Sequence, residues 1–423
     1  MSSKEFDLVC QKVLEEIVPD PAEVELLNKI TNDIVDAILK CSKGYSIVDA
    51  LPGGSFAKGT FLAGNTDLDI FVRLKTNTKK DLESFAENNA KCIAKKIKCE
   101  YKIAYAENPY IHVTVNRDKK KIEADIVPIA YAKDTSQLKS ALEISGMART
   151  PFHTMYALKK LDDKMRNEVR LLKYFAKQKR IYGVFGFTGW ICELLILHYK
   201  KFKNVIKHFE DFSNLAFDLE KRYTPRQLRK KFPNDKIIIL DPIDPDRNAA
   251  AGIQGFVGEM YIKRFMREAK RGLESPSTLF EKVDERGNIE ITFKLKPEVG
   301  SPIKETILTS LGHIVNVIQR NVAVIGYTVA DVYLVHDPIE IVLEVKPFDM
   351  PYQIKVGPPV RLKTAVKRFM EKNKDGEFFI KDNRYYAKVP SKYPTAIDAV
   401  TVALKLARMK IFESYEIKKG SKK

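Results

Sequence analysis

The sequence predicts an α+β protein built from several domains. Its 423 residues are more than one hydrophobic core usually organises. Strand and helix patterns alternate over residues 1–150, helical patterns dominate residues 151–272, and strands return over residues 273–423. We therefore expect three domains with these bounds: a mixed N-terminal domain, a helical middle domain and a mixed C-terminal domain.

Hydrophobic periodicity and turn residues define the elements of the N-terminal domain. Helices are expected at Phe6–Ile17, Asn28–Ser42 and Lys79–Lys98. Strands are expected at Ser46–Leu51, Asp67–Leu74, Tyr101–Ala106, Ile111–Asn116 and Ile122–Ile129. The polar run Arg117–Lys120 separates the last two strands and suits a hairpin turn.

Hydrophobic periodicity and helix-end signals also predict the helices and strands of the other two domains. The middle domain is expected to hold one strand, Lys236–Leu240, and helices at Asp163–Lys179, Gly189–Lys201, Asn204–Leu215 and Asn248–Lys270. The C-terminal domain is expected to hold strands at Asn288–Leu295, Ala323–Val335 and Glu340–Lys346, and helices at Ile303–Gln319, Val360–Glu371 and Ala396–Arg408. This order is typical of a small α+β sandwich.

The chain is strongly basic, with 73 Lys and Arg against 55 Asp and Glu and a net charge of +18 at pH 7. Such an excess indicates a polyanionic partner, because nucleic-acid affinity depends largely on phosphate neutralisation. Basic and aromatic residues interleave at Lys221–Tyr223, Arg229–Phe232, Lys367–Phe369 and Lys381–Tyr386. Each run alone is typical of a solvated helix face, but together they predict a track along an RNA backbone, recognised by shape and charge.

The cysteines and the apolar runs indicate where the protein works. The five cysteines have no CxxC spacing and an odd count, so free thiols in a reducing cytosol are expected. The most apolar run, Trp190–Tyr199, contains Glu193 and is too short to span a bilayer. We therefore expect a soluble cytoplasmic protein with no membrane partner.

A glycine turn followed by an acidic pair carries the most chemical information. The turn Gly53–Ser55 ends a predicted strand, and its backbone N–H groups could approach phosphate oxygens, aided by the positive end of a helix starting there. The Ser55 hydroxyl and the Lys58 ammonium suit the same phosphates. Asp67 and Asp69 lie two residues apart on the next strand, so both carboxylates project from one face and suit Mg²⁺.

Two-metal phosphoryl transfer also needs an acid from another strand. Asp125 lies among apolar neighbours on the strand Ile122–Ile129, where an unpaired carboxylate would be costly. Glu123 has the same strand parity and is the rival candidate. An Asp-x-Asp pair alone is more often two solvent-facing acids, and a glycine turn alone is usually only a turn. The ordered combination of turn, serine, acidic pair and strand acid is what predicts nucleotidyl transfer.

At these residues the chain resembles the polymerase-β-type nucleotidyltransferases, whose pattern is Gly-Ser, Asp/Glu-x-Asp and a later strand Asp. Within that superfamily it resembles the archaeal (class I) CCA-adding enzymes, which restore the 3′-terminal CCA of tRNA. The resemblance includes Gly54–Thr60, which is shared across the superfamily. The segments that narrow it to the CCA-adding enzymes are Arg149–His153, Lys173–Gly186 and Asp244–Asn248. The resemblance covers nearly the whole chain. It implies a polymerase-β-like head, a helical neck, and an α+β body and tail that bind tRNA.

The resemblance also implies the roles of single residues. Asp67, Asp69 and Asp125 match the catalytic residues that bind two Mg²⁺ ions, although the first is often Glu in the family. The positions that match nucleotide contacts are Ser55, Lys58, His153, Lys173, Tyr182 and Arg247. Without the resemblance, His153 would be interpreted as a packed histidine, Lys173 as a solvated charge and Tyr182 as a residue that anchors a loop.

The resemblance makes Arg247, just before the predicted helix Asn248–Lys270, a base reader. Cytosine and adenine each present a ring-nitrogen acceptor beside an amino donor, whereas uracil and guanine present a ring N–H beside a carbonyl. Because arginine only donates, it fits the acceptor of C or A and meets an unpaired donor on U or G.

The sequence therefore predicts addition of C, C and A to tRNA from CTP and ATP, with Mg²⁺ and without a nucleic-acid template. The expected RNA partner is the acceptor–TΨC half of tRNA, and a homodimer is compatible with the sequence. The main alternative is a poly(A) or oligoadenylate polymerase of the same superfamily, which the Arg247 segment argues against. A small-molecule nucleotidyltransferase would not need this length or charge. A catalytically dead RNA-binding relative is disfavoured because all three acidic positions are occupied.

Overall fold

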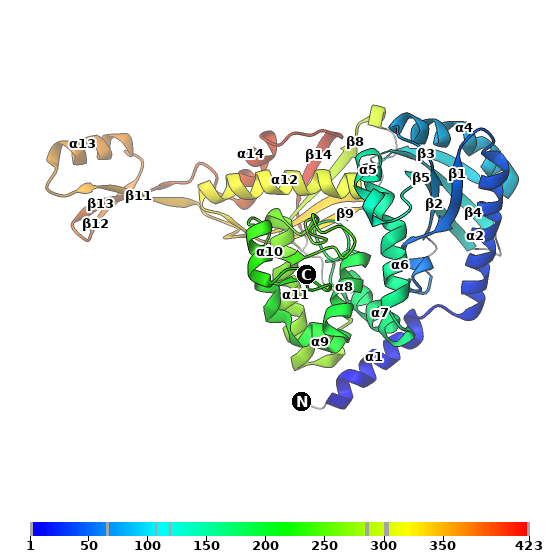
Figure 1. The fold of residues 1–423 in the computed structure, drawn as a ribbon. Helices are drawn as coiled ribbons and strands as arrows, with labels where there is room; N and C mark the ends of the chain where they lie inside the picture. The colour runs from blue at the N-terminus through cyan, green and yellow to red at the C-terminus, as the bar shows by residue number, and fades with distance from the viewer. Residues whose placement is uncertain are drawn as a thin grey trace. The chain divides into compact units, whose positions relative to one another are not determined.

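The computed structural model describes residues 3–64, 67–105, 108–117, 120–283, 287–299 and 304–420. It divides into two compact units. The first comprises Met1–Gln254 and Tyr261–Val283, and the second comprises Gly255–Met260 and Asp284–Lys423. Both units mix helices and sheets, so the α+β class is confirmed (Figure 1). The three domain bounds expected from the sequence stay predictions.

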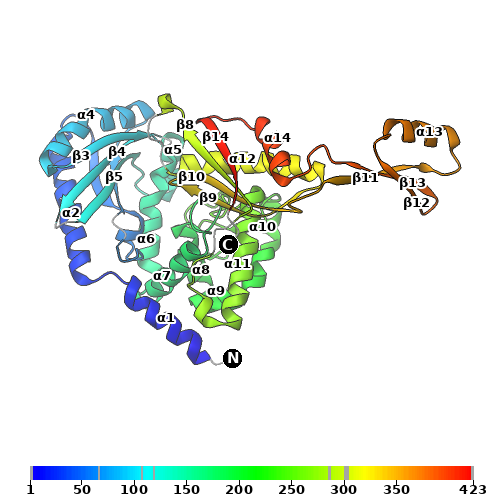
Figure 2. The same ribbon diagram turned by 180° about the vertical axis from the view of Figure 1, so that it is seen from behind.

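A five-stranded sheet organises the N-terminal part of the first unit. Its strands run in the order β1 (Ile47–Pro52), β2 (Asp67–Leu74), β5 (Lys120–Ala130), β4 (Pro109–Arg117) and β3 (Glu100–Tyr105). Two helices, α2 (Pro21–Cys41) and α4 (Lys79–Ile97), cover one face of this sheet (Figure 2). Side chains from both helices and from β2, β4 and β5 form one buried apolar core there. The opposite face of β2 and β5 is therefore left for polar groups.

The rest of the first unit is mainly helical. Its helices are α1 (Ser3–Ile17), α3 (Gly54–Ala57), α5 (Thr135–Ile144), α6 (Thr150–Lys160), α7 (Asp163–Gln178), α8 (Gly189–Tyr199), α9 (Phe202–Lys207), α10 (Pro225–Lys231) and most of α11 (Gly255–Glu274). Short 3-10 turns lie at Gly146–Arg149, Phe209–Ser213 and Pro276–Thr278. A small parallel sheet joins β6 (Ala216–Phe217) to β7 (Ile238–Ile239).

The described residues of the second unit form two antiparallel sheets and three helices that lie wholly within it. The larger sheet has the order β14 (Phe412–Lys419), β8 (Ile289–Leu295), β10 (Ile339–Lys346) and β9 (Thr328–His336). It packs with α12 (Lys304–Ile325) and α14 (Ala396–Lys405). The smaller sheet has the order β11 (Tyr352–Pro359), β13 (Arg384–Pro390) and β12 (Glu377–Lys381), with α13 (Lys363–Lys372) against it. Across the described ranges of both units, no helix has the length and apolarity to cross a membrane.

Several expected elements end or begin elsewhere. The expected helix Asn204–Leu215 is split into α9 and a 3-10 turn, and the expected helix Asn248–Lys270 begins only at Gly255, whose φ is +67°. The expected strand Ala323–Val335 begins at Thr328, because α12 continues to Ile325. Apolar runs fit a buried helix and a strand equally well, which explains this last error. The turn expected at Arg117–Lys120 includes residues outside the described ranges.

The expectation of five free thiols is wrong for two of them. A disulfide joins Cys41, the last residue of α2, to Cys92 on α4. The spacing of 51 residues has no sequence signature, because the pairing depends on how the two helices pack on the sheet. Cys10, Cys99 and Cys192 are free.

Candidate active site

The acidic residues predicted from the sequence lie side by side on two neighbouring strands. Strand β2 pairs with β5 in parallel, with Asp69 opposite Asp125 and Asp67 opposite Glu123. Alternation along both strands turns these four side chains away from the core formed with α2 and α4. The structure thus brings the three predicted acids together, and it places the rival Glu123 beside them.

The two acids on β5 differ in their partners. Asp125 pairs through Oδ1 with His112 Nδ1 at 2.7 Å, whereas Glu123 accepts from the Lys121 ammonium at 2.6 Å. The hydrogen bond from Lys121 lowers the pKa of Glu123. The carboxylates are adjacent but do not converge: among the described residues, no three His, Cys, Asp or Glu side chains enclose a point that could hold an ion.

The pKa of Asp69 is strongly raised. Burial, together with the neighbouring Asp125 and Asp67 carboxylates, raises it to about 6 against the opposing effect of Lys58. A carboxylate whose pKa is raised by neighbouring carboxylates is stabilised in its charged form by a nearby cation. The donor set of carboxylate oxygens therefore fits a divalent metal ion.

The glycine turn packs directly against Asp69. The Gly53 N–H donates to the Asp69 carbonyl at 2.8 Å. A Cβ atom at Gly54, whose φ is +60°, would lie 1.9 Å from Asp69 Oδ2, and one at Gly53 would lie 2.3 Å from the Phe71 ring. Only glycine fits at both positions, so the turn requires both glycines to sit this close to the carboxylates.

The helix expected after this turn is short. α3 covers only Gly54–Ala57, a single turn that contains Ser55, so the positive helix end expected from the sequence contributes little. The backbone then folds back, and the Thr60 N–H donates to the Ser55 carbonyl at 2.9 Å. The turn thus offers backbone N–H groups and one hydroxyl, rather than a helix dipole.

Two lysines predicted from different segments meet at one buried carboxylate. Glu193 on α8 accepts from Lys58 Nζ at 2.8 Å and from Lys173 Nζ at 3.4 Å. It also accepts from the Thr60 hydroxyl at 2.8 Å. Tyr182 lies next to this group: its hydroxyl and Lys173 Nζ lie 3.2 and 3.4 Å from where a Cβ at Gly189 would be. The structure therefore unites Lys58, Lys173 and Tyr182.

A second buried carboxylate joins His153 to Arg247. Asp241 Oδ2 lies 2.9 Å from His153 Nε2 and 2.7 Å from Arg247 Nη1. Burial would raise the pKa of Asp241, but its hydrogen bonds to His153 and the Ile243 N–H, together with the Arg247 charge, lower it to about 2. Because α11 begins at Gly255, Arg247 lies within a loop rather than at a helix start. Its side chain is 36% exposed, so part of the guanidinium faces solvent.

The only tryptophan lies between these two groups. The Trp190 ring stacks on His153 with centroids 4.2 Å apart, and the Lys58 ammonium lies 4.7 Å from the Trp190 ring centroid. Trp190 thus connects the lysine pair to the pair formed by His153 and Arg247. Aromatic stacking and a cation over a ring both favour a fixed arrangement of these side chains.

The sequence did not predict the residues that hold the predicted site residues in place. Glu193 and Trp190 lie in the apolar run Trp190–Tyr199, and Asp241 lies shortly before the segment Asp244–Asn248, but no site role was predicted for any of the three. One signal was available, since a carboxylate within the apolar helix Gly189–Tyr199 must have buried partners. Its partners could not be named, because Lys58 lies 135 residues earlier in the chain.

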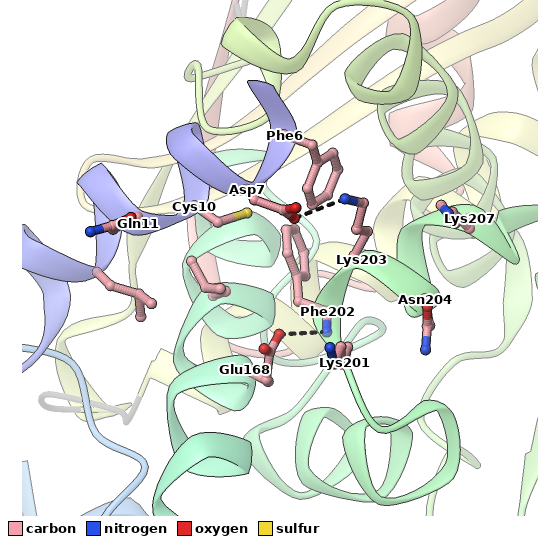
Figure 3. Close-up of a pocket in the computed structure, with 12 residues that line it drawn as sticks. Phe6, Asp7, Cys10, Gln11, Glu168, Lys201, Phe202, Lys203, Asn204 and Lys207 are labelled. Atoms are coloured by element: carbon pink, nitrogen blue, oxygen red, sulfur yellow. Dashed lines mark hydrogen bonds and ion pairs between the residues drawn. The ribbon is translucent and has the colours of Figure 1, made fainter. Parts of the chain in front are cut away.

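A separate pocket of about 460 Å³ lies elsewhere in the first unit. It lies among α1, α7 and α9, with Cys10, Glu168 and Lys203 in its wall (Figure 3). Glu168 accepts from the Phe202 N–H at 2.8 Å, and Lys203 pairs with Asp7 at 2.8 Å. None of the predicted site residues lines this pocket.

Family models match three consecutive parts of the chain. Residues 32–145 match a nucleotidyltransferase domain. Residues 167–281 match the second domain of tRNA nucleotidyltransferase, and residues 290–413 match the C-terminal domain of CCA-adding enzyme. The first match contains the glycine turn and the acidic residues, so the geometry described above belongs to a nucleotidyltransferase fold.

Curated relatives and solved structures extend these matches. A CCA-adding enzyme of Sulfurisphaera tokodaii is 34% identical, covering 90% of this chain and 88% of the relative. One of Methanocaldococcus jannaschii is 29% identical, covering 92% and 89%. A solved cytoplasmic RNA terminal U-transferase shares the fold over 66% of this chain and 99% of its own, at 16% identity and a TM-score of 0.50. The chain therefore belongs to the CCA-adding enzymes, a family of tRNA nucleotidyltransferases.

Proposed function

We propose that the chain adds C, C and A in turn to the 3′ end of tRNA, using CTP and ATP without a nucleic-acid template and releasing pyrophosphate. The observation that carries this proposal is the pairing of Asp69 with Asp125 beside the Gly53–Gly54 turn. Adjacent carboxylates next to a tight backbone turn suit a metal-bound triphosphate. The choice of tRNA and of the CCA sequence rests on membership of the family.

In this proposal Asp67, Asp69 and Asp125 hold two Mg²⁺ ions, as members of the superfamily generally use divalent metal ions. When bound, the ions neutralise the triphosphate and make the RNA 3′-hydroxyl a better nucleophile. The residues that hold the triphosphate are Ser55, Lys58, Lys173 and Tyr182. By holding it, they keep the α-phosphate in place for attack by the 3′-hydroxyl, with pyrophosphate as the leaving group.

His153 and Arg247 contact the incoming nucleotide in this proposal. The exposed part of the Arg247 guanidinium donates to the ring nitrogen of C or A, and U and G meet it with an N–H. The RNA partner is the acceptor–TΨC half of tRNA, in keeping with the net charge of +18. A homodimer is compatible with this function.

Incubation with tRNA that lacks its CCA end, labelled CTP or ATP, and Mg²⁺ tests the proposal. The intact protein should incorporate C and then A, and Asp69→Ala should abolish incorporation because a metal ligand is lost. Asp125→Asn should do the same, whereas Glu123→Gln should remain active, since Lys121 already engages that side chain. Equal loss in both β5 variants would contradict the assignment of Asp125.

The same assay separates the alternatives. Repeated incorporation of A without C would indicate a poly(A) or oligoadenylate polymerase. A chain that binds tRNA and incorporates neither nucleotide would be a catalytically dead relative. Unchanged incorporation by Asp69→Ala would refute the proposed site.

A further inference from the structure

A single carboxylate lies where the segment after the glycine turn meets the helices α7 and α8. Glu193 is on α8 and is 1% exposed. Its Oε2 accepts from Lys58 Nζ at 2.8 Å, and its Oε1 accepts from the Thr60 hydroxyl at 2.8 Å and from Lys173 Nζ at 3.4 Å. Both oxygens are thus committed to residues of the turn segment or to the lysine beside it.

The lysines on either side of Glu193 are also buried. Lys58 is 6% exposed and Lys173 is 2% exposed. Lys173 Nζ donates to the Thr60 carbonyl at 3.1 Å and to its hydroxyl at 2.8 Å, so this ammonium has three oxygen partners. The position of Lys173 is therefore fixed by Thr60 and Glu193 together.

Charge balance explains why a carboxylate is needed here. Burial lowers the pKa of Lys173 and favours its neutral form, while Glu193 opposes that shift. Burial alone would raise the pKa of Glu193, but the Lys58 and Lys173 ammonium groups lower it overall. Without the carboxylate, two ammonium groups would lie close together in a desolvated place, where like charges repel strongly.

The same helices hold the backbone that follows the glycine turn. Arg170 on α7 donates from Nη2 to the Gly59 carbonyl at 2.8 Å and from Nε to the Phe61 carbonyl at 2.9 Å. Lys173 also donates to the Thr60 hydroxyl, which in turn donates to Glu193. Together these contacts hold Gly59–Phe61 against α7 and α8. The turn next to Asp69 is therefore positioned by side chains from more than 100 residues later in the chain.

We propose that Glu193 is a positioning residue for the nucleoside triphosphate: it holds Lys58 and Lys173 as cations on the segment that follows the glycine turn. This inference rests on the proposed function, in which these lysines serve the triphosphate. Glu193 has no need to touch the nucleotide, because it acts through its two lysines and Thr60. Base recognition is assigned to His153 and Arg247, so Glu193 should not affect which base is selected.

Steady-state kinetics of Glu193→Gln test this role. The KM for CTP and for ATP should rise about 10- to 100-fold, the amount that loss of a charged hydrogen bond supplies. The KM for tRNA and the preference for C and A should stay as in the unaltered protein. Glu193→Asp keeps the charge and should restore part of the nucleotide affinity.

The pH dependence separates positioning from a merely structural effect. The groups that face Lys173 are Lys58 from the turn, Cys192 and Glu193 from α8, and Tyr182 from the segment before α8. In Glu193→Gln the lysine loses its counter-charge, so the nucleotide KM should begin to rise with pH at a lower pH than in the unaltered protein. A variant that is only less stable would keep the original pH profile.

Glu168→Gln is a matched control. Glu168 is on α7, and its Oε2 accepts from the Phe202 N–H at 2.8 Å in the wall of a pocket that neither Lys58 nor Lys173 lines (Figure 3). The amide oxygen of glutamine can accept the same bond, so nucleotide KM and its pH profile should not change. An equal effect of Glu193→Gln and Glu168→Gln would mean that any acid-to-amide change in α7 or α8 disturbs nucleotide binding. This result would overturn the proposal.

A double variant covers the case in which Glu193→Gln does not fold. Lys173→Met with Glu193→Gln removes one charge of each sign, so the net charge of the buried cluster stays the same and only Lys58 loses its carboxylate partner. Because Glu193 acts in part through Lys173, the two changes together should raise the nucleotide KM by less than the product of their separate effects. Where the single variant is unfolded, the double variant should have a higher nucleotide KM than Lys173→Met alone, because Lys58 is no longer held.

Two further results would overturn the proposal while the proposed function stands. One is a folded Glu193→Gln whose nucleotide KM and pH profile equal those of the unaltered protein. The other is a fully multiplicative effect in the double variant or, where Glu193→Gln is unfolded, a double variant whose nucleotide KM equals that of Lys173→Met. Failure of the unaltered protein to add C and A to tRNA would instead contradict the proposed function itself.

Discussion

Asp241 is a buried carboxylate with two side-chain partners that serve recognition in the proposed function. It is fully buried, and it fixes His153 on one side and one end of the Arg247 guanidinium on the other. Arginine bound at one end keeps its remaining donors in a defined direction, which a donor-only reader of bases requires. In the proposed function, the selectivity of Arg247 therefore depends on an acid six residues before it.

Asp241→Asn should reduce kcat/KM for CTP and ATP by about 10- to 100-fold, because a charge-assisted hydrogen bond to the guanidinium is weakened. It should also allow more U and G to be incorporated. Single-nucleotide incorporation on tRNA lacking its CCA end, with each of the four nucleotides in turn, measures both effects. Arg247→Ala should lose the same discrimination.

Asp246→Asn is the control for this loop, because the Asp246 carboxylate is exposed and pairs with Lys231 rather than with Arg247. It should behave as the unaltered protein. If either Asp241→Asn or Arg247→Ala kept full selection of C and then A, base reading by Arg247 would be refuted.

At the scale of elements, two helices on the five-stranded sheet are joined covalently. The Cys41–Cys92 disulfide connects the end of α2 to α4 across the core of the sheet. Closing a loop of this length restricts the unfolded chain more than the folded one. The stability of the sheet that carries the acidic residues is therefore coupled to the oxidation state of two cysteines.

Reduction of this disulfide, or Cys41→Ser with Cys92→Ser, should lower the free energy of unfolding by about 4 kcal/mol in the chain-entropy model. Urea unfolding with and without a thiol reductant measures the difference. Cys99→Ser should respond to reductant as the unaltered protein does, since Cys99 is free. Unfolding curves that coincide in both conditions would show that the two thiols are not joined.

A comparison of the expected and the observed elements shows what could be predicted from the sequence. The bounds expected for the strand Asp67–Leu74 match β2, and those of α4 differ by one residue, because alternation and capping are local signals. Which acid lies opposite Asp69 could not be derived, since Glu123 and Asp125 share one parity and only the register separates them. Glu193 and Asp241 were missed because their partners are brought together by packing rather than by spacing.

For the whole molecule, the dominant property is its charge. A net charge of +18 spread over 423 residues suits a long polyanion better than a single nucleotide. Binding that depends on phosphate neutralisation releases counterions and weakens steeply with salt.

The affinity for tRNA should therefore fall about 10³- to 10⁵-fold between 50 and 200 mM salt if six to ten phosphates are neutralised. Filter binding over a series of KCl concentrations measures the slope of log Kd against log salt. The KM for CTP should change far less over the same range. An affinity for tRNA that is independent of salt would contradict the backbone track expected from the basic residues.

The parallel pairing of β2 with β5 has a consequence for how the chain can change in length. Asp125 faces the same side of the sheet as Asp69 only because it lies an odd number of positions from core-facing neighbours such as Ile122. Loss of one residue such as Ala124 would exchange the two faces of the strand beyond that point, turning a carboxylate inward and Ile126 outward. Connections outside the sheet can lengthen or shorten freely, but the spacing within this strand is as restricted as the identity of the acid it carries.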